Sequence, residues 1–106
     1  MSHNLTKWTP TTNLMMLRRM GKLGEEPAEL SVVTNRCIIQ GIDEIDPGSG
    51  IINRERLEKE LADVMAQCIV TIEKLELNQE FIRARTEDKI EQMAEWEAMF
   101  EEGYSG

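Results

Sequence analysis

The chain has 106 residues and a mass of 12.2 kDa, which predicts one domain, because a chain this short rarely supports two hydrophobic cores. Its 20 acidic and 12 basic residues give a formal net charge of -8. This balance argues against binding to a nucleic-acid polymer, which depends on clustered Lys and Arg. Hydrophobic residues make up 41% of the chain, too many for a wholly disordered acidic tail.

The chain carries no sign of a membrane span or an export signal. It has no stretch of about 18 consecutive apolar residues, and residues 1–10 lack an apolar signal region, so we expect a cytoplasmic protein. Cys37 and Cys68 do not form a C-x-x-C pair, which favours two buried free thiols over a disulfide framework or a zinc site. We expect His3 to be a surface residue and no metal ligand.

The N-terminal half begins with a polar strip over residues 1–12 and continues as a helix over residues 14–40. Thr11 or Thr12 is expected to cap this helix. Pro27 interrupts the pattern because proline removes a backbone donor and clashes with the preceding turn. We therefore expect a kink just before Pro27, or two helices that meet there.

Residues 41–52 (GIDEIDPGSGII) are rich in Gly, Asp, Ser and Pro and predict a loop, whose acids fit neither register of a calcium-binding EF-hand. Asn53 is expected to cap a second helix that ends near Glu76. After a short turn, a third helix is expected from Gln79 to Glu102, with Gly103 ending it.

Three helices of roughly 25 residues with short connections predict an all-α fold, an antiparallel up-and-down bundle within one domain over residues 1–106. Only 5% of the residues are aromatic, so three helices alone would have a thin core. We therefore expect a second copy of the chain to complete the bundle.

Two pairs of acidic residues flank the apolar seams of the first two helices. Glu26 and Glu29 belong to an E-E-x-x-E motif, and Glu60 and Asp63 form E-x-x-D. Residues three apart share a helix face, so four carboxylates would converge where the two seams pack antiparallel. Like charges so close together either shift their pKa values or bind a cation. Oxygen ligands without a Cys or His cluster indicate Mg²⁺, with Mn²⁺ as a possible substitute.

The alternative interpretation of these pairs is that they are ordinary solvent-exposed glutamates in a chain with 20 acids. The third helix carries a basic pair, Arg85 and Lys89, which can likewise be interpreted as functional or as ordinary surface residues. Asp88 is the only acid at ion-pairing distance along the helix from Arg85, and Lys89 has none. The pair is therefore free to contact an external anion, with an ordinary surface role as the alternative.

Three segments taken together resemble the MazG-like members of the all-α nucleoside triphosphate pyrophosphohydrolases. They are KLGEEPAEL (residues 22–30), ELADVMAQ (60–67) and NQEFIRARTEDK (78–89). The resemblance implies antiparallel helices assembled as a homodimer or homotetramer. It also implies Mg²⁺-dependent hydrolysis of a (deoxy)nucleoside triphosphate to the monophosphate and pyrophosphate, by attack of a metal-activated water on the α-phosphorus.

The same resemblance implies roles for individual residues. The metal ligands would be Glu26, Glu29, Glu60 and Asp63, with Glu25 placing a further metal or the attacking water. The phosphate-binding residues would be Lys22, Gln67, Arg85 and Lys89. Relatives build the nucleoside pocket from the N-terminal segment and first helix, where Trp8 could stack on a base and Asn13 could hydrogen-bond to it. For Trp8, an equal alternative is a hydrophobic anchor at the end of the bundle or at a subunit interface.

Two other functions remain open at the level of the sequence. One is a non-catalytic helical oligomerisation or adaptor module that uses the same seams to bind a partner. The other lies within the same superfamily, a dUTP/dCTP or phosphoribosyl-ATP pyrophosphohydrolase, which only the substrate would distinguish.

Overall fold

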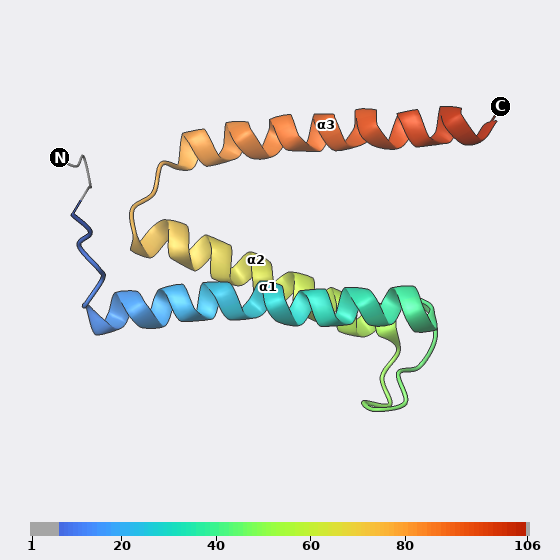
Figure 1. Ribbon diagram of the computed structural model, residues 1–106, viewed down its shortest axis with the longest axis horizontal. Helices are drawn as coiled ribbons and strands as arrows, with labels where there is room; N and C mark the ends of the chain where they lie inside the picture. Colours follow the sequence, from blue (N-terminus) through green and yellow to red (C-terminus); the bar gives the residue numbers. More distant parts are fainter. Residues whose placement is uncertain (1–6, 106) are drawn as a thin grey trace, which may run out of the picture. The chain divides into compact units, whose positions relative to one another are not determined.

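The computed structural model describes the backbone of residues 7–105 and side chains as far as Glu101, so His3 lies outside the described residues. It contains three helices, α1 (Leu14–Gln40), α2 (Asn53–Lys74) and α3 (Gln79–Ser105), shown in Figure 1. The described part of the chain has no β-strand and only an isolated bridge between Ile45 and Ile52. The predicted all-α fold is confirmed.

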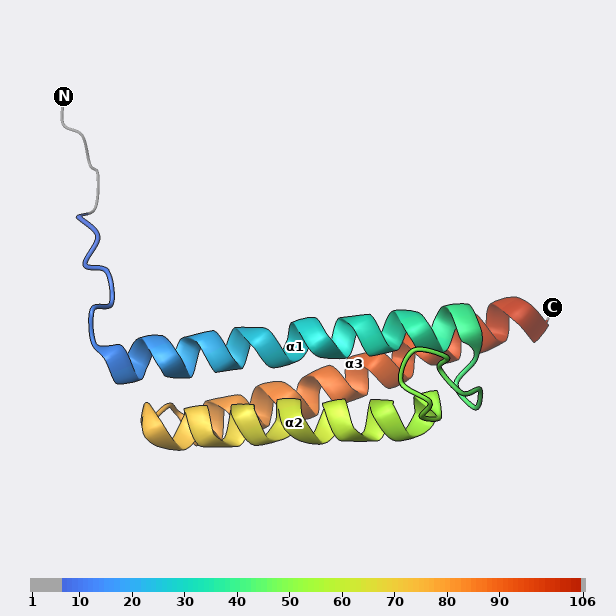
Figure 2. The ribbon, with the colours of Figure 1, turned by 90° about the horizontal axis from the view of Figure 1, so that it is seen from below.

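The chain divides into two compact units, Met1–Thr71 and Ile72–Gly106. The first unit holds α1, the loop and most of α2, and the second holds the end of α2 and all of α3. Within the first unit, α1 and α2 lie side by side and run antiparallel, as Figures 1 and 2 both show. None of the helices, over the described residues, has a run long and apolar enough to span a bilayer.

Helix α1 is continuous from its cap to its end. Its N-cap is Asn13, whose Oδ1 accepts a hydrogen bond from the Met16 N–H at 3.0 Å, so the prediction of a threonine cap is wrong. Pro27 lies inside the helix, and the two-helix alternative is also wrong. A proline costs one intrahelical hydrogen bond, and here the helical turns on both sides of it persist.

The buried seam between α1 and α2 follows the predicted apolar spacing on α1. Val33 is only 1% exposed and is the one fully buried apolar side chain among the residues described. Leu23, Leu30 and Cys37, on the same face, are half-buried. On α2 the prediction was partly wrong, because the Cys68 thiol is exposed, although both thiols are free as expected.

The loop between α1 and α2 is held by a hydrogen-bond network around Asp46, which is 6% exposed. Its carboxylate accepts hydrogen bonds from Gln40 Nε2 at 3.0 Å and from the Ser49 N–H at 2.9 Å, and it pairs with Arg56 at 3.3 Å. The bonds from Gln40 and Ser49, more than the charge of Arg56, hold the pKa of Asp46 below its usual range. The loop is therefore an ordered connection.

Helix α2 begins at Asn53, and loop carbonyls satisfy its first N–H groups. The Asn53 N–H donates to the Glu44 carbonyl at 3.0 Å, and the Arg54 N–H donates to the Ile42 carbonyl at 2.8 Å. The Asn53 side chain instead donates to Gln40 Oε1 and to the Gly41 carbonyl, both at 3.0 Å. The predicted capping role of Asn53 is therefore wrong, and its amide joins the two helix ends.

Helix α2 ends at Lys74, two residues before the predicted end, because the backbone of Glu76 turns left-handed with φ 50. The Leu77 N–H donates to the Ile72 carbonyl at 3.0 Å, and the Glu76 N–H donates to the Glu73 carbonyl at 3.3 Å. These are the two hydrogen bonds of a Schellman motif, which here forms without glycine.

Helix α3 begins after Asn78, whose Oδ1 accepts from the Phe81 N–H at 2.9 Å. It continues to Ser105, past Gly103, which was wrongly predicted to end it. Most of its large apolar side chains are exposed, including Trp96 at 59%, whose ring packs edge-on against that of Phe100 with the ring centroids 4.6 Å apart.

Candidate metal centre

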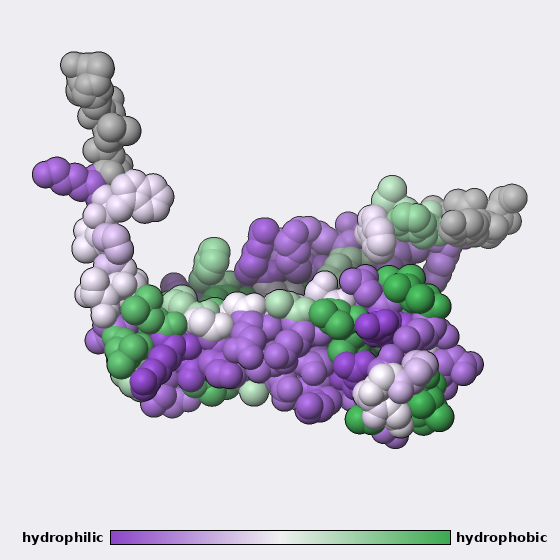
Figure 3. Space-filling view, turned by 60° about the horizontal axis from the view of Figure 1, so that its bottom comes forward, coloured by the Kyte–Doolittle hydropathy of each residue, from purple (hydrophilic) through white to green (hydrophobic). Residues whose placement is uncertain are grey.

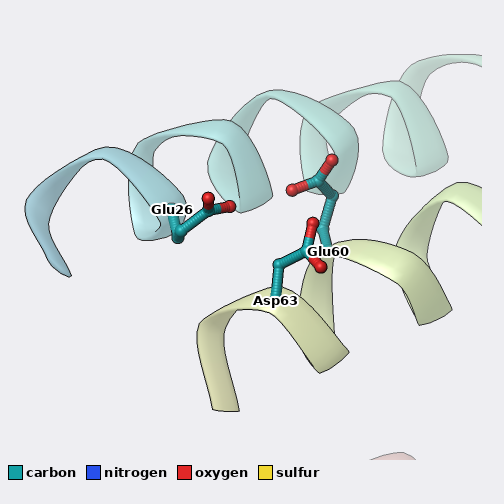
Figure 4. Close-up of side chains that lie close together, drawn as sticks. All are labelled: Glu26, Glu60 and Asp63. Atoms are coloured by element: carbon teal, nitrogen blue, oxygen red, sulfur yellow. The ribbon is translucent and has the colours of Figure 1, made fainter. Parts of the chain in front are cut away.

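Three carboxylates from the two antiparallel helices converge at the α1–α2 seam. Glu26 comes from α1, and Glu60 and Asp63 come from successive turns of α2. One oxygen of each carboxylate lies within 4.8 Å of the other two. Figure 4 shows the Glu26 carboxylate directed toward the two acids of α2. The i,i+3 spacing on α2 and the antiparallel packing of α1 produce this convergence.

The cluster concentrates negative charge in a partly buried place. All three side chains are half-buried, and Glu26 Oε2 and Glu60 Oε2 are hidden from solvent without a hydrogen-bond partner among the described residues. Burial, followed by the charges of Glu29, Asp63, Glu60 and Glu25, raises the pKa of Glu26. A bound divalent cation would offset both the repulsion and the missing partners, so these residues fit a hard, oxygen-preferring metal such as Mg²⁺.

The two remaining acids of the E-E-x-x-E motif lie beside this cluster and outside the group of three. Glu29 is exposed, and its charge is the largest electrostatic contribution to the raised pKa of Glu26. Glu25 is also exposed and pairs with Lys22 at 3.3 Å on the same helix. At least half of the Lys22 side chain and of the Glu25 side chain is exposed to solvent. Lys22, one of the predicted phosphate-binding residues, therefore forms an ion pair at the surface.

Gln67, one turn after Asp63 on α2, makes a contact that the sequence analysis did not anticipate. Its Oε1 accepts a hydrogen bond from Arg19 Nη1 of α1 at 2.6 Å. Sequence reasoning overlooked Arg19, although a spacing of seven residues places it on the same helix face as Glu26 and could have indicated it. This pair extends the polar part of the seam beyond the carboxylates.

The other predicted site residues are not part of this cluster. Arg85 and Lys89 are exposed on α3, in the second unit. Among the described residues neither forms an ion pair, and Asp88, the neighbour of Arg85, accepts from Gln92 Nε2 at 3.0 Å. Trp8 is 89% exposed, and Asn13 is engaged as the cap of α1.

Comparisons with protein-family models, with curated proteins and with solved structures find no match to this chain.

Proposed function

We propose that the chain is a Mg²⁺-dependent nucleoside triphosphate pyrophosphohydrolase of the MazG-like type, with Mn²⁺ as a possible substitute for Mg²⁺. The observation that supports this proposal is the convergence of Glu26, Glu60 and Asp63, two of whose oxygens have no hydrogen-bond partner among the described residues. Hydrolysis would release the monophosphate and pyrophosphate. A cluster of like charges at a helix seam has no structural benefit of its own, which favours a role in cation binding.

The carboxylates of Glu26, Glu60 and Asp63 would hold the metal, and Glu29 would complete the set after a change of rotamer. When bound, Mg²⁺ neutralises phosphate charge and polarises a water for attack on the α-phosphorus. Glu25, exposed beside the cluster, is suited to orient that water or to bind a further cation. The phosphoanhydride is already an activated bond, so positioning and charge neutralisation are the main requirements.

Basic and amide side chains would bind the remaining phosphates. Gln67 lies next to the cluster along α2, and Lys22 lies one turn before Glu26 on α1. Arg85 and Lys89 on α3 form no ion pair in the described part of the chain, and the resemblance gives both of them a role in phosphate binding. The nucleoside would stack on Trp8, and Asn13 could contribute the oxygen lone pair that its capping bond leaves free.

The same proposal includes assembly of the chain with itself, as a homodimer or homotetramer acting in the cytoplasm, where nucleoside triphosphates are present. Large apolar side chains are exposed on every helix, among them Met15 at 70%, Met65 at 63% and Phe81 at 67%. Exposed apolar surface of this extent is typical of protein–protein interfaces. A second copy would cover it and complete the core.

The experiment that tests this function is a panel of common and modified (deoxy)nucleoside triphosphates, assayed for pyrophosphate release with and without MgCl₂. We expect Mg²⁺-dependent release from at least one of them. Glu60→Gln should lower the rate at least about 100-fold, the upper range for losing a residue that merely supports a metal ligand. Glu73→Gln, an exposed position on the same helix, is the matched control and should retain activity. Absence of release from every nucleotide would refute the function.

A further inference from the structure

The strongest unexplained contact of the first unit is the hydrogen bond between Arg19 and Gln67. Arg19 is half-buried, and its guanidinium donates to a neutral amide across the helix seam at 2.6 Å. A guanidinium carries five N–H donors and a permanent positive charge. In the part of the chain with described side chains, one of these donors has a partner, and none of the ion pairs involves Arg19.

The sequence around Arg19 provides no carboxylate to neutralise this charge. The positions three and four residues away on α1 are occupied by Met15, Met16, Lys22 and Leu23. An arginine held at a helix seam for stability alone would be expected to pair with an acid, because burial of an unpaired charge is costly. Its remaining donors are therefore available to an anion from outside the chain.

The contact lies on the same seam as the acidic cluster. Arg19 precedes Glu26 by seven residues, about 10 Å along α1, and Gln67 follows Asp63 by four residues, about 6 Å along α2. A polyphosphate that meets the carboxylates through Mg²⁺ at one end can extend over this distance. All four residues belong to the same compact unit, whereas Arg85 and Lys89 belong to the other.

We propose that Arg19, held at Gln67, is a binding residue for the pyrophosphate portion of the substrate. This inference rests on the proposed function and adds a binding residue to it. In the reaction, the water oxygen bonds to the α-phosphorus and one water proton passes to solvent. The bond from the α-phosphorus to the bridging oxygen breaks, and its electron pair stays on pyrophosphate. Negative charge therefore grows on the group that the guanidinium contacts.

Calorimetric titration of the full chain with inorganic pyrophosphate, with and without Mg²⁺, tests this inference. We expect Arg19→Ala to weaken Mg²⁺-dependent pyrophosphate binding at least about tenfold, the effect of losing a charged hydrogen bond. Arg18→Ala removes the same charge from an exposed neighbouring position and should change the affinity by less than about twofold. Mg²⁺ binding measured without pyrophosphate should survive in both variants.

A second variant separates binding from folding. Arg19→Gln keeps an amide that can donate to Gln67 but removes the charge, so it should retain the helical circular dichroism of the wild type and still lose pyrophosphate affinity. If pyrophosphate binding requires Mg²⁺ but is the same in wild type, Arg19→Gln and Arg19→Ala, the inference about Arg19 is overturned alone. If the wild type binds neither Mg²⁺ nor pyrophosphate, both the proposed function and the inference about Arg19 are refuted.

Discussion

Glu26, Glu60 and Asp63 form a carboxylate cluster in which no residue neutralises another. One oxygen of each carboxylate lies within 4.8 Å of the other two, and no basic side chain of the described residues pairs with them. In the absence of a cation, burial and neighbouring negative charges disfavour the ionised form of Glu26, which is why its pKa is raised. Without a bound cation, the repulsion between these carboxylates therefore works against folding.

Mg²⁺ should consequently stabilise the folded chain. At a Mg²⁺ concentration 100 times its dissociation constant, the free energy of unfolding should rise by about 2.7 kcal/mol. Asp63→Asn removes one ligand and one negative charge, so this variant should respond far less to Mg²⁺. Thermal melting curves with MgCl₂ and with EDTA measure both effects. Equal melting temperatures of the wild type under the two conditions would instead favour a non-catalytic adaptor module.

The sequence predicts the convergence of these acids because their i,i+3 spacing and the apolar seams are local properties of each helix. It places Glu29 in the same set, yet the structure leaves that side chain exposed beside the other three. The bond between Arg19 and Gln67 joins residues 48 positions apart and depends on the register between the helices. A pattern within one helix does not determine that register.

The residue at which each helix begins or ends depends on which polar groups hydrogen-bond to the free backbone N–H and C=O groups there. Asn13 caps α1 although two threonines precede it, and loop carbonyls take the place of the cap expected at Asn53. The left-handed turn at Glu76 ends α2 without the glycine that usually marks such a position. These outcomes depend on the path of the chain beyond each helix, which propensity alone does not predict.

The loop between α1 and α2 should lose stability in acid through Asp46. Hydrogen bonds from Gln40 and Ser49 lower the pKa of this carboxyl from 3.8, so its contribution to stability is present above pH 3.8. That contribution is lost as the pH falls through the lowered pKa of the folded state. Asp46→Asn should therefore melt below the wild type at pH 7, and the gap should narrow in acid. Melting curves across pH test this, and a gap independent of pH would contradict it.

At the scale of the whole molecule, the exposed apolar surface is the dominant feature. Figure 3 shows apolar side chains gathered around the loop, where Ile38, Ile39 and Ile45 are 75%, 77% and 60% exposed. On α3, Phe81, Met99 and Ile90 are 67%, 68% and 61% exposed. The sequence anticipates this shortage of core from the 5% aromatic content. It does not indicate which faces a second copy would cover.

The chain should therefore assemble in solution. Sedimentation equilibrium at micromolar concentrations should give two or four times the 12.2 kDa of one chain, because association buries the exposed apolar side chains. Trp96→Asp on α3 places a charge on the apolar face and should shift the equilibrium toward smaller species. A wild-type protein that sediments as a single chain at these concentrations would contradict the proposed assembly.

Hydrolysis in ¹⁸O-labelled water reports which phosphorus atom of the nucleoside triphosphate the water attacks. The full chain is incubated with Mg²⁺ and the nucleoside triphosphate of the panel that it hydrolyses fastest, and the masses of the products are measured by mass spectrometry. We predict one ¹⁸O atom in the nucleoside monophosphate and none in pyrophosphate, since the water attacks the α-phosphorus. Label in pyrophosphate or release of inorganic phosphate would contradict attack at the α-phosphorus, and turnover that persists in Glu60→Gln would contradict catalysis at the carboxylate cluster.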